Sequence, residues 1–141
     1  MEDLRFEKFI GENEAVDNYL SQSIIDYGIL QQKGDIPVKL FCSCKNNDGV
    51  FVGAVMGAKT LNLFFISHIF VEEKIRNNKI GSELLAKIEE SAKNEGCTIL
   101  RLNTFNDLSH RFYENNGFIE TVRINNYMNG FDLVFYEKSI S

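Results

Sequence analysis

Three stretches of the chain repeat apolar side chains at the spacing of one helix face. The first runs from about Glu12 to Gln32, and the second from about Ile80 to Glu95. The third is short and runs from Ser109 to Asn116. Gly96 and Gly117 follow the second and third stretches, and glycine is a common stop signal at the end of a helix. The pattern therefore predicts three helices.

Between and around these helices the chain carries shorter apolar stretches of the kind that form strands. These are Leu4–Phe9, Lys39–Cys44, Val50–Ala58, Leu61–Val71, Thr98–Thr104, Ile119–Tyr127 and Phe131–Lys138. The turn residues Asn46–Gly49 and Asn129–Gly130 predict two hairpins. The stretch Leu61–Val71 is apolar on both faces, so we expect it in the middle of a sheet.

In chain order the predicted elements read β-α-β-β-β-α-β-α-β-β. This order predicts a mixed α/β protein in which helices cover both faces of one central sheet. No internal repeat and no linker rich in Pro, Gly or Ser divides the 141 residues. We therefore expect a single domain over residues 1–141.

The composition narrows the function classes. The chain has 20 acidic and 15 basic residues and a net charge of -5, which disfavours a protein that coats nucleic acid. Its three cysteines show no spacing typical of a disulfide framework or a zinc site, so we expect no metal. The longest apolar stretch, Val50–Ala58, is far shorter than the roughly 18 residues of a membrane span. The charged first residues do not resemble a secretory signal. We expect a cytoplasmic protein without a membrane partner.

The most informative segment runs from Ile69 to Leu85, where an apolar strand enters a charged turn and then a helix. The first N–H groups of a helix have no partner within it and attract anions. The turn carries the densest basic cluster of this acidic chain, Lys74, Arg76 and Lys79, and Gly81 allows a close approach to the backbone. These features predict a phosphate or pyrophosphate cradle. The alternative is a plain turn whose basic side chains are solvated.

Two ordered motifs resemble those of the GNAT family of acyl-CoA-dependent N-acetyltransferases. The first is a strand ending in a hydrophobic-x-Val unit, followed by Arg/Gln-x-x-Gly-x-Gly/Ala at the start of a helix. It corresponds here to Ile69-Phe70-Val71 and then Arg76 to Gly81 and Ser82. The second is an Asn after the next strand and a Phe-Tyr-x-x-x-Gly-Phe unit, which correspond to Asn106 and Phe112–Phe118. The resemblance covers nearly the whole chain and implies the GNAT fold, with a mostly antiparallel sheet of six to seven strands.

The resemblance also implies a binding site for the cosubstrate acetyl-CoA. Ile69, Phe70 and Val71 would pair with its pantetheine arm, which Asn106 would also contact. The pyrophosphate would lie on the turn and the start of the helix: Arg76, Asn77, Asn78, Lys79, Ile80, Gly81 and Ser82. Lys79 stands where the family commonly has glycine. From the residues alone, Asn106 is nearly as well explained as a helix cap.

Proton transfer needs an acid for the leaving thiolate and a base for the amine. Tyr113 matches the tyrosine that protonates the thiolate in many family members, and the motif favours this role. From the residues alone, packing in the core with Phe112 and Phe118 explains Tyr113 better. His68 is a candidate base because its ordinary pKa suits proton uptake near neutrality. A histidine on an apolar strand is more often a core residue, and a water chain ending on Glu72 or Glu73 is an alternative.

These features together predict an N-acetyltransferase that transfers acetyl from acetyl-CoA directly to a primary amine. The alternative is a catalytically silent acyl-CoA-binding or interaction module with the same fold. The sequence does not identify the acceptor, although Asp26, Asp35 and Asp132 could attract a cationic amine. Exposed edge strands would favour a homodimer.

Overall fold

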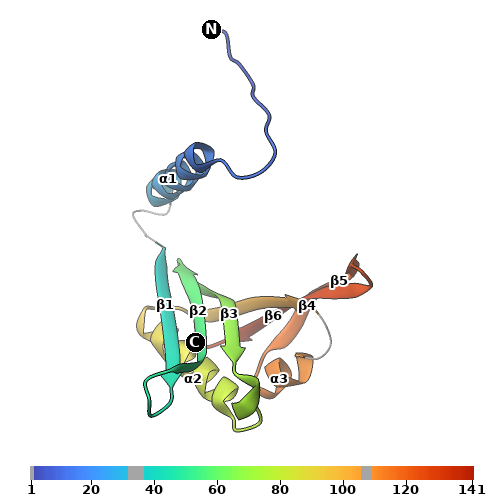
Figure 1. Cartoon of the computed structure of the whole chain (residues 1–141). Coiled ribbons are helices and arrows are strands. Elements are labelled where there is room, and N and C mark those ends of the chain that lie inside the picture. Colours follow the sequence, from blue (N-terminus) through green and yellow to red (C-terminus); the bar gives the residue numbers. More distant parts are fainter. Residues whose placement is uncertain (1, 32–36, 106–108) are drawn as a thin grey trace. The chain divides into compact units, whose positions relative to one another are not determined.

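The computed structural model describes residues 2–31, 37–105 and 109–141. The chain forms two compact units, Met1–Ile36 and Pro37–Ser141, and each is described here by itself (Figure 1). The sequence predicted one domain over residues 1–141, and that organisation stays a prediction. The second unit holds the whole sheet and the buried core.

The first unit contains one helix, α1, which spans Glu14–Gln31 among the residues described. The side-chain oxygen of Asn13 accepts a hydrogen bond from the N–H of Val16 at 3.0 Å, which explains why the helix begins there. The strand predicted at Leu4–Phe9 does not form, so that prediction is wrong. A strand is stable only when a neighbour pairs with its backbone groups, and no described strand pairs with this segment.

The second unit is built on a six-stranded sheet with the order β1-β2-β3-β4-β6-β5 (Figure 1). Its strands are β1 Val38–Lys45, β2 Phe51–Thr60, β3 Leu63–Val71, β4 Ile99–Phe105, β5 Ile119–Met128 and β6 Phe131–Ser139. Every neighbouring pair is antiparallel except β3 and β4. The predicted mixed, mostly antiparallel sheet is confirmed, with β3 in its interior.

Both predicted hairpin turns form, and each depends on an asparagine. The side-chain oxygen of Asn46 accepts the N–H groups of Asp48 and Val50 at 2.9 and 3.0 Å, which closes the turn between β1 and β2. At the β5–β6 turn, Asn129 and Gly130 have φ angles of 51° and 83°. Two consecutive positive φ angles match the twist of a tight hairpin, and Asn-Gly adopts them readily.

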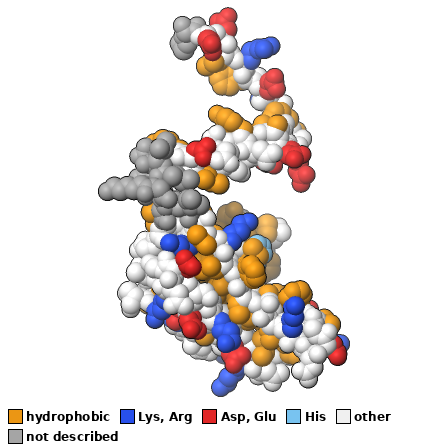
Figure 2. Space-filling model, turned by 90° about the vertical axis from the view of Figure 1, so that its left-hand side faces the viewer, with side chains coloured by type: hydrophobic (Ala, Val, Ile, Leu, Met, Phe, Trp, Pro, Cys, Tyr) orange, Lys and Arg blue, Asp and Glu red, His pale blue; other side chains and the backbone are white. Residues whose placement is uncertain are grey.

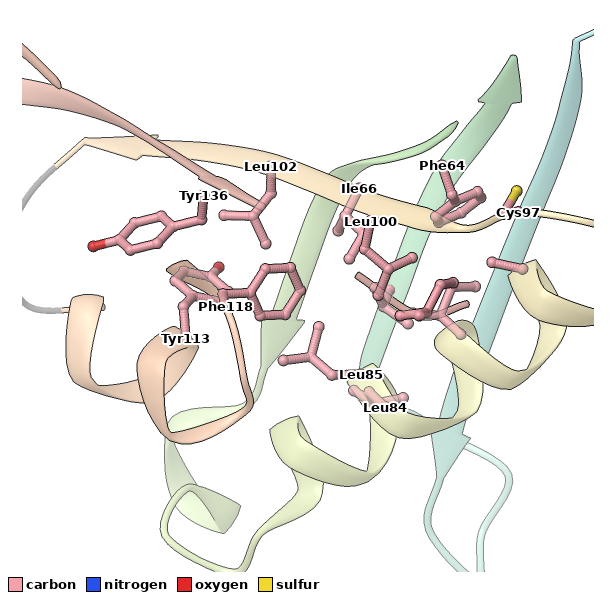
Figure 3. Packing of buried hydrophobic residues seen from close by; sticks show 14 of the residues in the cluster. Phe64, Ile66, Leu84, Leu85, Cys97, Leu100, Leu102, Tyr113, Phe118 and Tyr136 are labelled. Carbon is pink, nitrogen blue, oxygen red and sulfur yellow. The ribbon is translucent and has the colours of Figure 1, made fainter. Parts of the chain in front are cut away.

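Two helices cover one face of this sheet, α2 at Ile80–Asn94 and α3 at His110–Asn115. The apolar stripe of α2 packs under β1, β2 and β3, and Tyr113 of α3 joins the same buried cluster (Figure 3). The cluster also contains strand side chains, among them Val55, Phe64, Ile66, Leu100, Leu102, Val134 and Tyr136. The sequence also predicted a helix on the opposite face of the sheet. The remaining helix, α1, belongs to the first unit and is not described relative to the sheet.

Strand β3 is apolar on both sides, as predicted. Phe64 and Ile66 are buried towards α2, whereas Phe70 belongs to a set of exposed apolar side chains that also includes Phe41 and Phe105. Figure 2 shows orange hydrophobic side chains gathered on one face of the Pro37–Ser141 unit, with Lys and Arg side chains among them. No helix of the described residues is long and apolar enough to cross a membrane.

The pairing of β3 with its two neighbours is irregular in two places. With β4, only Leu63, Phe64 and Phe65 pair, opposite Ile99 to Arg101. With β2, the register shifts between Met56 and Gly57, so that Met56 faces His68 while Gly57 faces Ile66. Ser67 is therefore an extra residue in β3, which defines a β-bulge.

Gly57 allows β3 to approach β2 closely beside this bulge. A Cβ atom at position 57 would lie 2.2 Å from the backbone oxygen of Phe65 and 2.7 Å from the ring of Phe64. We expect Gly57→Ala to lower the free energy of unfolding by about 2 kcal/mol or more, because backbone cannot move aside as a flexible side chain can. Urea unfolding measures the loss. Ala54→Gly, on the same strand, should cost no more than about 1 kcal/mol, and an equal loss in both variants would contradict the steric explanation.

Candidate active site

A cavity of about 610 Å³ lies where β3 ends and α2 begins. Its wall comes from three segments that are far apart in sequence: the end of β3, the turn with the start of α2, and α3. The lining residues are Ile69, Phe70, Val71, Arg76, Asn77, Lys79, Ile80, Gly81, Ser82, Ser109, Phe112 and Tyr113. Two of these side chains are cationic and none is a carboxylate, so the cavity suits an anionic ligand.

The end of β3 offers an unpaired strand edge to this cavity. The N–H of Glu72 donates to the carbonyl of Val52 at 2.9 Å, on the β2 side. Backbone groups alternate in direction along an antiparallel pair, so Ile69 and Val71 direct theirs away from β2. On that side β4 pairs with β3 only as far as Phe65. An extended ligand can therefore pair with the backbone groups of Ile69 and with the N–H of Val71 as an additional strand would, while the carbonyl of Val71 accepts from Arg76.

The turn after β3 is held by its own polar side chains. The Nε of Arg76 donates to the carbonyl of Val71 at 2.9 Å, and the Nδ2 of Asn78 donates to the carbonyl of Ile75 at 3.2 Å. Arg76 thus closes the turn and still lines the cavity. Asn78 was predicted to hold pyrophosphate, but the cavity lining does not include it.

Asn77 and Lys79 adopt left-handed backbone conformations, with φ angles of 70° and 63°. Position 79 is one at which the family commonly has glycine, so the backbone path does not depend on glycine there. Lys79 is the residue that precedes the first turn of α2, and no side-chain hydrogen bond caps that helix. The N–H groups of its first turn, from Ile80 onward, are the donors that a phosphate would accept.

Gly81 permits a close contact between α2 and α3. A Cβ atom at position 81 would lie 3.0 Å from Cζ and 3.2 Å from Cε1 of Phe112. The sequence suggested that glycine lets the backbone approach a ligand, whereas the contact in the structure is with this aromatic ring. Phe112 therefore sets the distance between the start of α2 and the helix that carries Tyr113.

Tyr113 is both a core residue and a residue of the cavity wall. The centroid of its ring lies 5.8 Å from that of Phe118 and 5.6 Å from that of Tyr136 (Figure 3). The centroid of the Phe112 ring is 5.2 Å away. Burial raises the pKa of the Tyr113 phenol above its usual value, and the neighbouring Tyr136 raises it further. The phenol therefore stays protonated at neutral pH and can act as a proton donor.

His68 lies on the other side of β3 from the buried cluster. Ile69 and Val71 pack against that cluster, so the alternation of a strand directs His68 to the opposite face. His68 does not line the cavity. Its Nδ1 lies 3.0 Å from the Oγ of Ser67. The predicted base and the predicted acid therefore lie on different faces of the sheet.

The remaining predicted residues differ in outcome. Asn106 and Asp35 lie outside the described residues. Asp132 accepts the N–H of Asn126 at 2.9 Å and forms an ion pair with Arg123 at 2.7 Å, and both interactions lower the pKa of its carboxyl group. Arg123 also forms an ion pair with Glu120 at 2.7 Å, so one cation is shared by two carboxylates and the cluster keeps a net negative charge.

Two residues of the cavity wall, Ser109 and Phe112, were not predicted as site residues. Ser109 precedes Tyr113 by four residues, so a helix places both on one side. Phe112 belongs to the motif that contains Tyr113. Both signals were present in the sequence. No group of three or more His, Cys, Asp or Glu side chains within the described ranges could hold a metal ion.

Comparison with known proteins identifies the family. The model of the acetyltransferase (GNAT) family matches residues 4–118. Acetyltransferase Atu2258 of Agrobacterium fabrum (strain C58) is 29% identical over 94 residues, which are 67% of this chain and 69% of that protein. The chain belongs to the GNAT acetyltransferase family.

Two solved structures share the fold. One is the crystal structure of a protein from Agrobacterium tumefaciens described as an acetyltransferase, with a TM-score of 0.90 and 22% identity over 97% of this chain and 100% of that one. The other is a protein from Bacillus anthracis described as a streptothricin acetyltransferase, in complex with acetyl coenzyme A. Its TM-score is 0.66 and its identity 19%, over 73% of this chain and 63% of that one. These likenesses confirm the fold class.

The left-handed backbone conformation of Lys79 should lower the free energy of unfolding. A non-glycine residue in this conformation is disfavoured by roughly 1–2 kcal/mol, so we expect Lys79→Gly to raise the free energy of unfolding by about 1 kcal/mol. Lys74→Ala removes the same charge from the neighbouring turn without changing a left-handed position, and it should leave stability nearly unchanged. Urea unfolding of both variants is the measurement. A Lys79→Gly variant no more stable than Lys74→Ala would contradict the argument.

Proposed function

We propose that this chain transfers the acetyl group of acetyl-CoA to a primary amine by direct transfer, without an acyl-enzyme intermediate. The observation that carries the proposal is the unpaired edge of Ile69 and Val71, which leads into the cationic start of α2 beside a protonated Tyr113. Bound acetyl-CoA would supply an acetyl thioester. Its extended pantetheine arm suits the strand edge, and its pyrophosphate suits the N–H groups at the start of α2.

Each residue of the site has a role in this proposal. Ile69 and Val71 would orient the arm through their backbone groups, and the N–H of Val71 would polarise the thioester carbonyl. Lys79 and Arg76 would attract the phosphates. Tyr113 would give its proton to the departing thiolate formed beside it, and its raised pKa keeps the phenol protonated until then. The predicted contact of Asn106 with the pantetheine arm also remains part of the proposal.

The amine must lose a proton before it attacks, and we propose His68 as the base that takes it. His68 lies on the face of β3 opposite the cavity, so an amine would approach from one side of the sheet and the cosubstrate from the other. The alternative route, through water to Glu72 or Glu73, uses residues that directly follow β3. Substitution of His68 by Gln separates the two routes, because only the first requires an imidazole.

Further parts of the proposal concern the acceptor, the assembly and the compartment. The acceptor would be a primary amine, and the net negative charge of Glu120, Arg123 and Asp132 would attract a cationic one. A homodimer would use an edge strand, β1 or β5. A cytoplasmic location agrees with the free thiols of Cys42 and Cys44.

Binding of the cosubstrate is tested by calorimetric titration with CoA and acetyl-CoA. Lys79→Glu reverses a charge in the cavity wall, so we expect it to weaken CoA binding about tenfold or more, equivalent to about 1.4 kcal/mol. Lys74→Glu makes the same charge change at a residue that does not line the cavity, and it should weaken binding much less. Absence of CoA binding by the folded wild-type protein would favour the alternative of an interaction module.

The role of Tyr113 is tested by Tyr113→Phe. We expect turnover of acetyl-CoA with an amine acceptor to fall by about 10²-fold or more, while CoA affinity changes little. Because burial raises the pKa of Tyr113, the wild-type rate should fall through loss of this proton only above about pH 10. That alkaline fall should be absent from the variant. Tyr127→Phe, in the β5–β6 hairpin, is the matched control, and equal losses in both variants would contradict the assignment.

A further inference from the structure

The β-bulge in β3 places Ser67 and His68 side by side. Neighbouring side chains of a regular strand point to opposite faces and do not meet. Here the register shift opposite Met56 and Gly57 leaves Ser67 as the extra residue, and its Oγ lies 3.0 Å from the Nδ1 of His68. The contact between two consecutive residues therefore depends on the pairing of β3 with β2.

The direction of this hydrogen bond follows from the second contact of the serine. The Oγ of Ser67 donates to the backbone carbonyl of Met56 at 3.3 Å. A serine hydroxyl has one proton to donate, and a backbone carbonyl can only accept. With its proton directed to Met56, Ser67 can only accept from His68. The proton of the neutral imidazole is then on Nδ1, and Nε2 carries the free lone pair.

We infer that Ser67 is a positioning residue that fixes His68 in the tautomer with a basic Nε2. Three groups form a chain of hydrogen bonds, here called the relay although only His68 takes up a proton. The carbonyl of Met56 accepts from Ser67, Ser67 accepts from Nδ1–H of His68, and Nε2 of His68 takes the proton of the acceptor amine. The inference rests on the proposed function for its last step. The tautomer itself depends only on the two hydrogen bonds to Ser67.

The proton that the amine loses is fully accounted for. The proton leaves the amine nitrogen and binds Nε2, which gives an imidazolium whose Nδ1–H still donates to Ser67. No proton moves along the serine, which acts only by holding the ring and its tautomer. In water a free imidazole exchanges between both tautomers. A fixed tautomer therefore raises the fraction of molecules ready to accept the proton and does not affect acetyl-CoA binding.

The tautomer can be measured directly by NMR, because the chain has only two histidines, His68 and His110. Long-range proton–nitrogen spectra of the protein labelled with ¹⁵N-histidine, with His110→Gln for assignment, report which ring nitrogen carries the proton. We expect the neutral His68 ring of the wild type to be protonated on Nδ1. Ser67→Ala should restore a mixture of tautomers, and Ser67→Thr, which keeps the hydroxyl, should retain the wild-type pattern. A wild-type ring protonated on Nε2 would overturn the inference.

Kinetics then separate the relay from the proposed function. We expect Ser67→Ala to lower kcat roughly tenfold with an unchanged KM for acetyl-CoA, and Ser67→Thr to restore it. In a His68→Gln background, Ser67→Ala should have no further effect, and an equal additional loss there would overturn the inference. If the protein turns over acetyl-CoA while the neutral ring of His68 is protonated on Nε2, the relay is refuted and the proposed function stands. A protein with Nδ1 protonated that acetylates no amine refutes the proposed function and leaves the tautomer assignment standing.

Discussion

The site depends on one constraint, the short parallel pairing between β3 and β4. Only Leu63, Phe64 and Phe65 pair with β4, so the backbone groups of Ile69 and Val71 have no strand beside them. The antiparallel neighbour β2 still pairs with β3 up to Val71 and therefore holds that edge rigid. A strand that is supported on one side and open on the other can bind an extended ligand without a change in the fold.

The second element of the site is the contact between α2 and α3. Gly81 lies so close to the ring of Phe112 that a Cβ atom there would be 3.0 Å from Cζ, and Phe112 in turn packs against Tyr113. Because Tyr113 also contacts Phe118 and Tyr136, its phenol is fixed by the hydrophobic core (Figure 3). The same burial that holds the ring raises the pKa of the phenol, so packing also keeps the phenol protonated.

The turn between β3 and α2 contains a residue, Lys79, that has both a strained backbone conformation and a positive charge. Lys79 adopts a conformation that favours glycine, yet it brings a cation to the wall of the cavity. The loss of stability is local, because Arg76 fixes the end of β3 through the carbonyl of Val71 and the apolar stripe of α2 anchors the helix. A binding site can retain a strained residue when the surrounding structure determines the backbone so strongly.

The sequence by itself determined the order of the helices and of the six strands that form, the two Asn-dependent turns and the junction at Ile69–Ser82, because these depend on local periodicity and turn chemistry. Only the tertiary structure decided that Leu4–Phe9 is not a strand, that Gly81 packs against Phe112, and that Arg123 pairs with Asp132. It also decided that Ser67 meets His68, since a bulge exists only relative to the register of a neighbouring strand. Contacts between segments far apart in the chain require the folded backbone, and a pattern within one segment does not specify them.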